Sequence, residues 1–132
     1  DLRKLFPDSF IHFAATHRGA TLYIDRAQIE QVLINLIKNA KESCGQNTAP
    51  QIEVELEQVP GKVCSLTVRD NGEGILPEVI DKVFVPFFTT KPSGSGIGLS
   101  LCKQIMNLHG GTITVSSEIG KGSCFTLMFP GR

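Results

Sequence analysis

The sequence feature that most restricts the fold is a stripe of apolar residues at helical spacing. Between Asp25 and Cys44, apolar side chains recur at the i, i+3, i+4, i+7 positions of one helix face, namely Ile29, Val32, Leu33, Leu36, Ile37 and Ala40. Asp25 is suited to cap the first free amides of this helix, and Gly45 follows its last turn. Such a helix is stable only when a broad apolar surface covers its apolar face.

Segments of alternating polarity are predicted to supply that surface. Residues 52–56 alternate apolar side chains with glutamates, and residues 64–68 alternate apolar with polar side chains, which together predict a hairpin. A second hairpin is predicted from Thr112–Ser117 and Ser123–Phe129. The remaining predicted elements are strands within residues 10–15 and 21–24, and helices at 77–83 and 97–109.

The order of these elements predicts an α+β fold, a two-layer sandwich in which about three helices cover one face of a mixed, mainly antiparallel sheet. A length of 132 residues suits one domain, 1–132, with 1–16 expected as an inter-domain linker plus the first strand. The 13 basic residues match 13 acidic ones, so no positive excess favours a nucleic-acid partner. No apolar run approaches the length of a membrane span.

The cysteines and histidines carry no metal-site pattern. Cys44, Cys64, Cys102 and Cys124 lack the paired spacing of zinc ligands, and each lies in or beside an apolar segment. We therefore expect them to be reduced, small buried side chains. Among the histidines, His109 ends a predicted helix and is suited to contact its last carbonyls.

Polar residues beside the helical stripe form the first candidate site. Asn35 and Asn39 are four residues apart and point the same way from the helix, and Gln28, Gln31 and Glu42 extend this ridge. The ridge could be an ordinary solvated edge. Alternatively, the two amide oxygens border a ligand site, where neutral oxygens suit a magnesium ion that already carries phosphate charge.

A second candidate follows the strand that ends at Asp70. This carboxylate continues the apolar face of the strand, and Gly72 and Gly74 come directly after it. The segment is either common turn chemistry or a buried carboxylate that accepts a hydrogen bond from a ligand's amine. In the second case the glycines would let the backbone approach a flat base closely.

A third candidate precedes the helix at 97–109. Gly94, Gly96 and Gly98 lead into that helix, so they form either a flexible linker or an anion site made of free amides. Upstream, Phe84 is expected to anchor the loop to the core. Lys91, between this anchor and the glycines, is either a solvated side chain or a cation for phosphate oxygens.

Together and in this order, the segments resemble the catalytic, ATP-binding domain of bacterial sensor histidine kinases, in the GHKL superfamily. The resemblance covers about residues 21–130. Residues 35–40 resemble the N-box, 70–75 the first glycine box, 84–91 the F-box and 94–99 the second glycine box. It implies the Bergerat ATP-binding sandwich, with ATP and magnesium as cofactors.

The resemblance also implies roles for single positions. Asn35, Asn39 and Lys91 would be the catalytic set, with Asn39 binding magnesium and Lys91 lying on a lid formed by 83–96. Asp70 would accept a hydrogen bond from the adenine amine. The nucleotide-binding set would be Asn39, Asp70, Gly72, Gly74, Ile75, Phe84, Gly94, Gly96, Gly98 and Leu99.

The chain departs from the family pattern in the helix that carries the N-box. Many members have Lys and Tyr where this chain has Glu42 and Ser43. The phosphate and adenine contacts that the resemblance assigns to that pair would then be made by Lys38, Lys41 or Lys91. The ATPase branches carry Glu at the position of Asn35. An amide cannot take a proton from water, which favours a kinase over a hydrolase.

The implied reaction transfers the γ-phosphate of ATP to a histidine on a separate dimerisation domain, leaving ADP, with a response regulator as indirect partner. No segment resembles that dimerisation domain, so we expect a catalytic fragment that is monomeric alone. It would act in the cytoplasm, within a full-length protein that is either anchored in the inner membrane or soluble. A kinase of the anti-sigma serine type and a degenerate nucleotide-binding interaction module remain alternatives.

Overall fold

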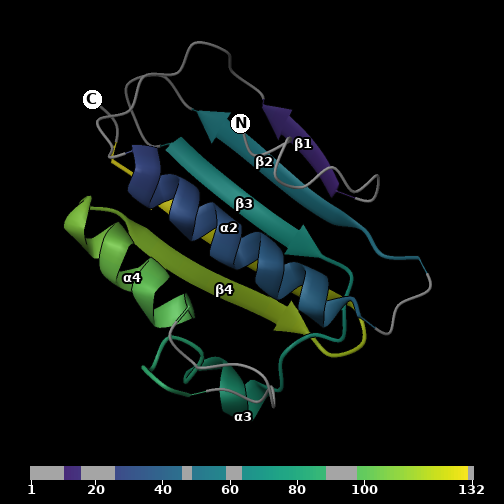
Figure 1. The fold of residues 1–132 in the computed structure, drawn as a ribbon. Coiled ribbons are helices and arrows are strands. Elements are labelled where there is room, and N and C mark those ends of the chain that lie inside the picture. Colours follow the sequence, from purple (N-terminus) through teal and green to yellow (C-terminus); the bar gives the residue numbers. More distant parts are fainter. Residues whose placement is uncertain (1–10, 16–25, 46–48, 59–63, 89–97, 131–132) are drawn as a thin grey trace.

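The computed structural model describes residues 11–15, 26–45, 49–58, 64–88 and 98–130, and confirms the predicted two-layer α+β sandwich (Figure 1). Its elements in chain order are β1 (Ile11–Ala15), α2 (Arg26–Ser43), β2 (Ile52–Gln58), β3 (Cys64–Asp70), α3 (Pro77–Ile80), α4 (Gly98–Leu108), β4 (Thr112–Glu118) and β5 (Gly122–Phe129). The predicted strand at 21–24 lies outside the described residues.

The described strands form one mixed sheet in the order β1-β2-β3-β5-β4. Both predicted hairpins are confirmed, because β2 pairs antiparallel with β3 and β4 pairs antiparallel with β5. The first strand β1 runs parallel to β2 at one edge. The two hairpins are joined by β3 and β5, which place Val68 opposite Phe125 and Asp70 opposite Ser123.

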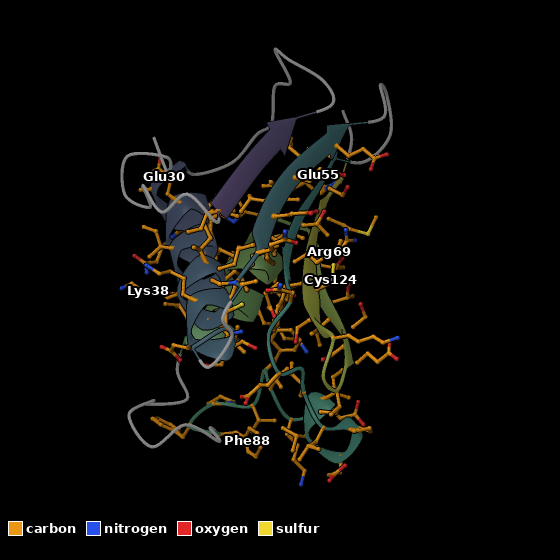
Figure 2. The ribbon with its side chains drawn as sticks, turned by 90° about the vertical axis from the view of Figure 1, so that its right-hand side faces the viewer. Glu30, Lys38, Glu55, Arg69, Phe88 and Cys124 are labelled. Atoms are coloured by element: carbon orange, nitrogen blue, oxygen red, sulfur yellow. The ribbon has the colours of Figure 1, made fainter. Side chains whose placement is uncertain are left out.

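Helices α2 and α4 cover one face of the sheet (Figure 1), and the opposite face carries Glu55, Arg69 and Cys124 (Figure 2). On this open face Arg69 forms an exposed ion pair with Glu53 at 3.8 Å, a type of contact that contributes little to stability. None of the helices in the described part of the chain is long and apolar enough to cross a membrane.

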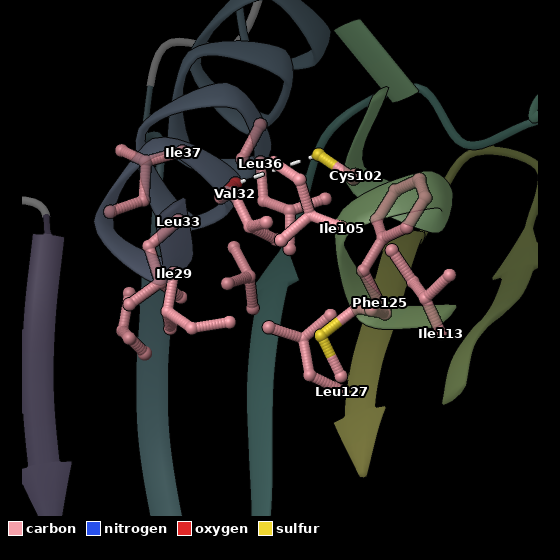
Figure 3. Packing of buried hydrophobic residues seen from close by; sticks show 14 of the residues in the cluster. Ile29, Val32, Leu33, Leu36, Ile37, Cys102, Ile105, Ile113, Phe125 and Leu127 are labelled. Atoms are coloured by element: carbon pink, nitrogen blue, oxygen red, sulfur yellow. Dashed lines mark hydrogen bonds between the residues drawn. The ribbon is translucent and has the colours of Figure 1, made fainter. Parts of the chain in front are cut away.

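The core forms where α2 and α4 meet the sheet (Figure 3). Every apolar residue predicted for the α2 stripe is buried: Ile29, Val32, Leu33, Leu36, Ile37 and Ala40. From the sheet, Val68, Phe125 and Leu127 are among the residues that join this cluster. Cys44, Cys64 and Cys102 are buried as expected, whereas Cys124 is only partly buried.

The short helix α3 is the main departure from the predicted elements. It ends at Ile80 rather than Val83, and it contacts β4. The chain then continues in tight turns, with Lys82 N donating to Val79 O at 2.8 Å and Val85 N donating to Lys82 O at 3.0 Å. Pro86 has no N–H to donate, so a longer helix could not continue through it.

The longer helix α4 ends as expected. His109 Nδ1 donates to the carbonyl of Ile105 at 2.8 Å, which satisfies one carbonyl in the last turn. Gly110 adopts φ +70°, and Gly111 N donates to Met106 O at 2.9 Å. This ending turns the chain into β4.

Leucine 36 tests the dependence of the fold on the α2 stripe, because its side chain is 0% exposed. We expect Leu36→Ala to lower the free energy of unfolding by about 2–5 kcal/mol, from lost burial and the cavity left behind. Leu108→Ala is the matched control, because Leu108 is helical and 72% exposed, and its change should stay within about 0.5 kcal/mol. Urea unfolding of both variants measures this, and equal midpoints would contradict the assignment of the core.

Candidate functional site

Asp70 ends the buried face of β3 and is itself only 5% exposed. Its neighbours across the sheet are Ile52 on β2 and Ser123 on β5. Its Oδ1 accepts a hydrogen bond from the Gly72 amide at 2.9 Å. The segment therefore forms a turn after a buried carboxylate, and a hydrogen bond from a ligand's amine to Asp70 stays a prediction.

The glycines after Asp70 lie where no side chain fits. A Cβ atom on Gly72 would overlap Ser43, and Glu73 N donates to Ser43 O at 3.2 Å. Gly74 adopts φ +80°, and a Cβ there would approach Glu118 O to 2.5 Å. The segment is therefore held between the end of α2 and the end of β4, and glycine is needed at both positions.

Two serines from the β4–β5 hairpin complete this end of the molecule. Ser117 Oγ accepts from Ile75 N at 2.7 Å, donates to Gly122 O at 2.9 Å and lies 3.1 Å from Ser123 Oγ. Ser123 is 5% exposed and lies opposite Asp70. Neither serine was a candidate from the sequence, because local periodicity does not reveal the pairing of β3 with β5, which places Ser123 opposite Asp70.

Asn71 has a structural function at this end. Its Oδ1 accepts from Gln51 N at 2.7 Å, and its Nδ2 donates to Ala49 O at 2.9 Å. The Cys44 thiol donates to the same Oδ1 at 3.5 Å. Burial, and to a smaller extent the nearby Asp70 carboxylate, raises the pKa of the Cys44 thiol.

The polar ridge of α2 borders α4. Asn35 Oδ1 accepts from Gln31 Nε2 at 3.0 Å, and Asn35 Nδ2 lies 3.4 Å from the carbonyl oxygen of Gly98, the first residue of α4. Asn39 is half-buried one turn further along α2. Asn35 is therefore a contact between two helices rather than a solvated side chain.

A buried thiol adds a second contact between α2 and α4. Cys102 Sγ donates to Val32 O at 3.7 Å, as the dashed line in Figure 3 shows. Burial raises the pKa of Cys102 to about 11, against a smaller lowering by a hydrogen bond with Asn35. This thiol is therefore protonated at neutral pH and acts as a donor between the helices.

Phe84 anchors its segment to the core, as predicted. Its ring meets that of Phe125 edge-on, with centroids 6.2 Å apart and planes at 84°. The Lys103 ammonium lies 5.7 Å from the centroid of the same ring. Further along, Phe87 is 74% exposed and adopts φ 67°, a conformation uncommon outside glycine.

The candidate residues divide between the two ends of one stretch of α2. Ser43 touches the segment after Asp70, and Asn35 touches the start of α4, where Gly98 and Leu99 lie. Eight residues of helix separate these contacts by about 12 Å along the helix axis. Lys91, Gly94 and Gly96 lie outside the described residues.

A divalent metal would find amide oxygens rather than an acidic cage here. The described residues contain no group of three or more His, Cys, Asp or Glu side chains that could hold a metal ion. Magnesium commonly takes one or two protein oxygens and completes its shell with phosphates and water. The half-buried amide of Asn39 fits that arrangement, provided that a nucleotide brings the phosphates.

Comparison with known proteins gives one consistent family. A family model described as histidine kinase-, DNA gyrase B-, and HSP90-like ATPase matches residues 24–132. The sensor histidine kinase ZraS of Escherichia coli K12 is 38% identical over 120 residues, which cover 91% of this chain and 25% of ZraS. The chain thus spans about a quarter of the length of the curated relatives it matches first.

Solved structures agree with that family. The catalytic domain of the histidine kinase ThkA has a TM-score of 0.84 and 33% identity, over 98% of this chain and 87% of that chain. ThkA in complex with the response regulator protein TrrA has a TM-score of 0.80 and 30% identity, over 99% of this chain and 38% of that chain. The chain therefore belongs to the histidine kinase-, DNA gyrase B- and HSP90-like ATPase family, as a catalytic domain of the sensor histidine kinase type.

Proposed function

We propose that this domain binds ATP with magnesium and donates the γ-phosphate to a histidine on a separate dimerisation domain, in two-component signalling. One observation carries the binding proposal. Asp70, a carboxylate that is 5% exposed, ends an apolar sheet face within a domain of an ATPase family. A buried carboxylate needs donors, and the exocyclic amine of adenine is one.

The base end would be the segment from Asp70 to Ile75. Its packing against Ser43 and Glu118 makes it rigid, so the carboxylate is held in place before a ligand arrives. Asp70 would accept from the adenine amine while the Gly72 amide keeps one oxygen oriented. The same contacts serve ATP and ADP, because these nucleotides share the base.

The phosphate end would be the ridge of α2 and the start of α4. Amides in the first turn of a helix lack internal partners and favour anions. Asn39 would offer its amide oxygen to magnesium, which neutralises phosphate charge when bound. Phosphoryl transfer depends mainly on such positioning and charge stabilisation.

The reaction would use an external nucleophile. An imidazole nitrogen of the partner domain would attack the γ-phosphorus, and the bond to the β-phosphate oxygen would break to release ADP. Asn35 would hold α4 without activating water, since an amide is not a general base. The domain would therefore retain ATP until the histidine arrives.

The partners of the full-length kinase belong to the same proposal. The ThkA complex with TrrA supports a response regulator as the downstream partner. The cytoplasm, where ATP is available, would be the site of action. Membrane attachment would depend on other parts of the full-length protein.

The Asp70→Asn variant tests the base end. An amide can still accept from the Gly72 amide, so the turn should be retained, but its NH₂ group would face the adenine amine donor. We expect the affinity for magnesium-ATP and ADP to fall roughly 10- to 100-fold, the equivalent of a charged hydrogen bond. Isothermal titration measures this change.

The matched control is Glu55→Gln, which neutralises a carboxylate on the open face of the sheet (Figure 2). It should bind nucleotide like the wild type. Wild-type affinity in Asp70→Asn would refute the assigned base contact. Failure of the wild type itself to bind ATP or ADP at millimolar concentration would refute the proposed function.

Asn39→Ala should remove the effect of magnesium rather than the fold. Alanine is a better helix former than asparagine, so α2 should not be weakened. We expect nucleotide affinity in magnesium to fall to the value measured in EDTA, where wild type and variant should agree. Asn107→Ala, the same change at an exposed position of α4, is the control, and an unchanged magnesium response in Asn39→Ala would contradict the assignment.

Two glycine variants should separate ligand contact from packing. A Cβ on Gly98 would meet only Asn35 Cγ, at 4.0 Å, so Gly98→Ala should fold normally but weaken ATP binding where phosphates approach the backbone. Gly74→Ala should instead lower the melting temperature, because its φ of +80° costs an L-residue about 1–2 kcal/mol before the contact with Glu118 is counted. Thermal unfolding and titration are the measurements, and full ATP affinity in Gly98→Ala would argue against backbone contact there.

A further inference from the structure

Gln31 has no role in the motifs described above, yet its side chain contacts Asn35. Gln31 Nε2 donates to Asn35 Oδ1 at 3.0 Å, and Asn35 Nδ2 lies 3.4 Å from Gly98 O. The contacts run in one direction, from the exposed Gln31 through a half-buried amide to the first residue of α4. The hydrogen bond between Cys102 and Val32 also joins α4 to α2.

The chemistry of the amide makes this direction meaningful. A side-chain amide has an accepting oxygen at one end and a donating NH₂ group at the other, whereas a backbone carbonyl only accepts. Asn35 can therefore satisfy Gly98 in only one of its two flipped orientations. In the observed arrangement the NH₂ group of Gln31 donates to the oxygen of Asn35, which supports the orientation that leaves the NH₂ group of Asn35 for Gly98 O.

The carbonyl of Gly98 belongs to the same planar peptide as the amide of Leu99. In a trans peptide the C=O and N–H groups point in opposite directions, so fixing one fixes the other. Leu99 N–H is one of the first amides of α4, which lack partners inside the helix. A contact on Gly98 O therefore adds a second restraint, beside the hydrogen bond within the helix, on the direction of an amide at the proposed phosphate end.

We infer that Gln31 is a positioning residue for nucleotide binding. It holds the Asn35 amide in the orientation that anchors the start of α4 and aims the Leu99 amide. The ligand in this inference rests on the proposed function, but the anchoring of α4 does not.

Two variants of Gln31 differ in what they offer to Asn35. Gln31→Met removes the donor at similar length, and we expect magnesium-ATP affinity to fall about two- to fivefold, in line with one exposed hydrogen bond. Gln31→Glu replaces the donor with an acceptor, which would attract the NH₂ group of Asn35 and turn it away from Gly98. The oxygen of Asn35 would then face the carbonyl oxygen of Gly98. The affinity of Gln31→Glu should fall about tenfold.

The control for added negative charge is Gln104→Glu, at an exposed position of α4, which should bind like the wild type. A double-mutant cycle with Asn35→Ala isolates the coupling. In the Asn35→Ala background, the difference in magnesium-ATP affinity between Gln31→Met and Gln31→Glu should shrink. It should be no larger than the effect of the charge control Gln104→Glu in the same background. A gap between the Gln31 variants that persists undiminished would overturn the inference.

A readout without nucleotide separates this inference from the proposed function. In the nucleotide-free protein, hydrogen exchange of the Cys102 amide, which bonds to the Gly98 carbonyl in the α-helical pattern, should be fastest in Gln31→Glu and slowest in the wild type. Unchanged exchange in Gln31→Glu would exclude the anchoring role, whether or not the protein binds ATP. Faster exchange in a protein that binds no ATP would keep the anchoring role and refute the proposed function alone.

Discussion

The burial of one face of α2 against the sheet is the constraint on which the candidate site depends. Leu36 and Ile37 are fully buried, so the helix cannot roll without exposing them to water. Side chains of a helix keep fixed angular positions around its axis. The packing that buries the stripe therefore also sets the directions of Asn35 and Asn39, and stability and site geometry are linked through one helix.

Close packing at the carboxyl end of β3 is the second constraint. The segment after Asp70 is held between Ser43 and Glu118 at distances that only glycine permits. Its backbone is also satisfied from the β4–β5 hairpin, since Gly120 N donates to Glu73 O at 3.0 Å and Ser117 accepts from Ile75 N. A buried carboxylate is costly unless donors surround it, and this framework provides the first of them. The proposed base end is thus held in place by the packing of the protein itself, which would lower the ordering cost of binding a ligand.

Much of the fold followed from local patterns. The stripe in α2, both hairpins and the ending of α4 agree with the structure, because each depends on residues close together in the sequence. The extent of α3 did not follow, because tight turns replace the helix after Ile80 where Phe84 packs against Phe125, a contact with a distant segment. For the site, the motifs pointed to Asp70 and Asn35, whereas the serines of the β4–β5 hairpin and the contact of Asn35 with Gly98 became visible only in the structure.

The sequence by itself determined which segments are helices and strands, which of their faces are buried and which family the ordered motifs resemble. Periodicity and motif spacing express these properties directly, since both depend on residues in one segment. Only the tertiary structure decided that β3 pairs with β5, that Ser123 lies opposite Asp70 and that Asn35 reaches Gly98. These contacts join segments far apart in the chain, and their register depends on how the whole core packs rather than on any local pattern.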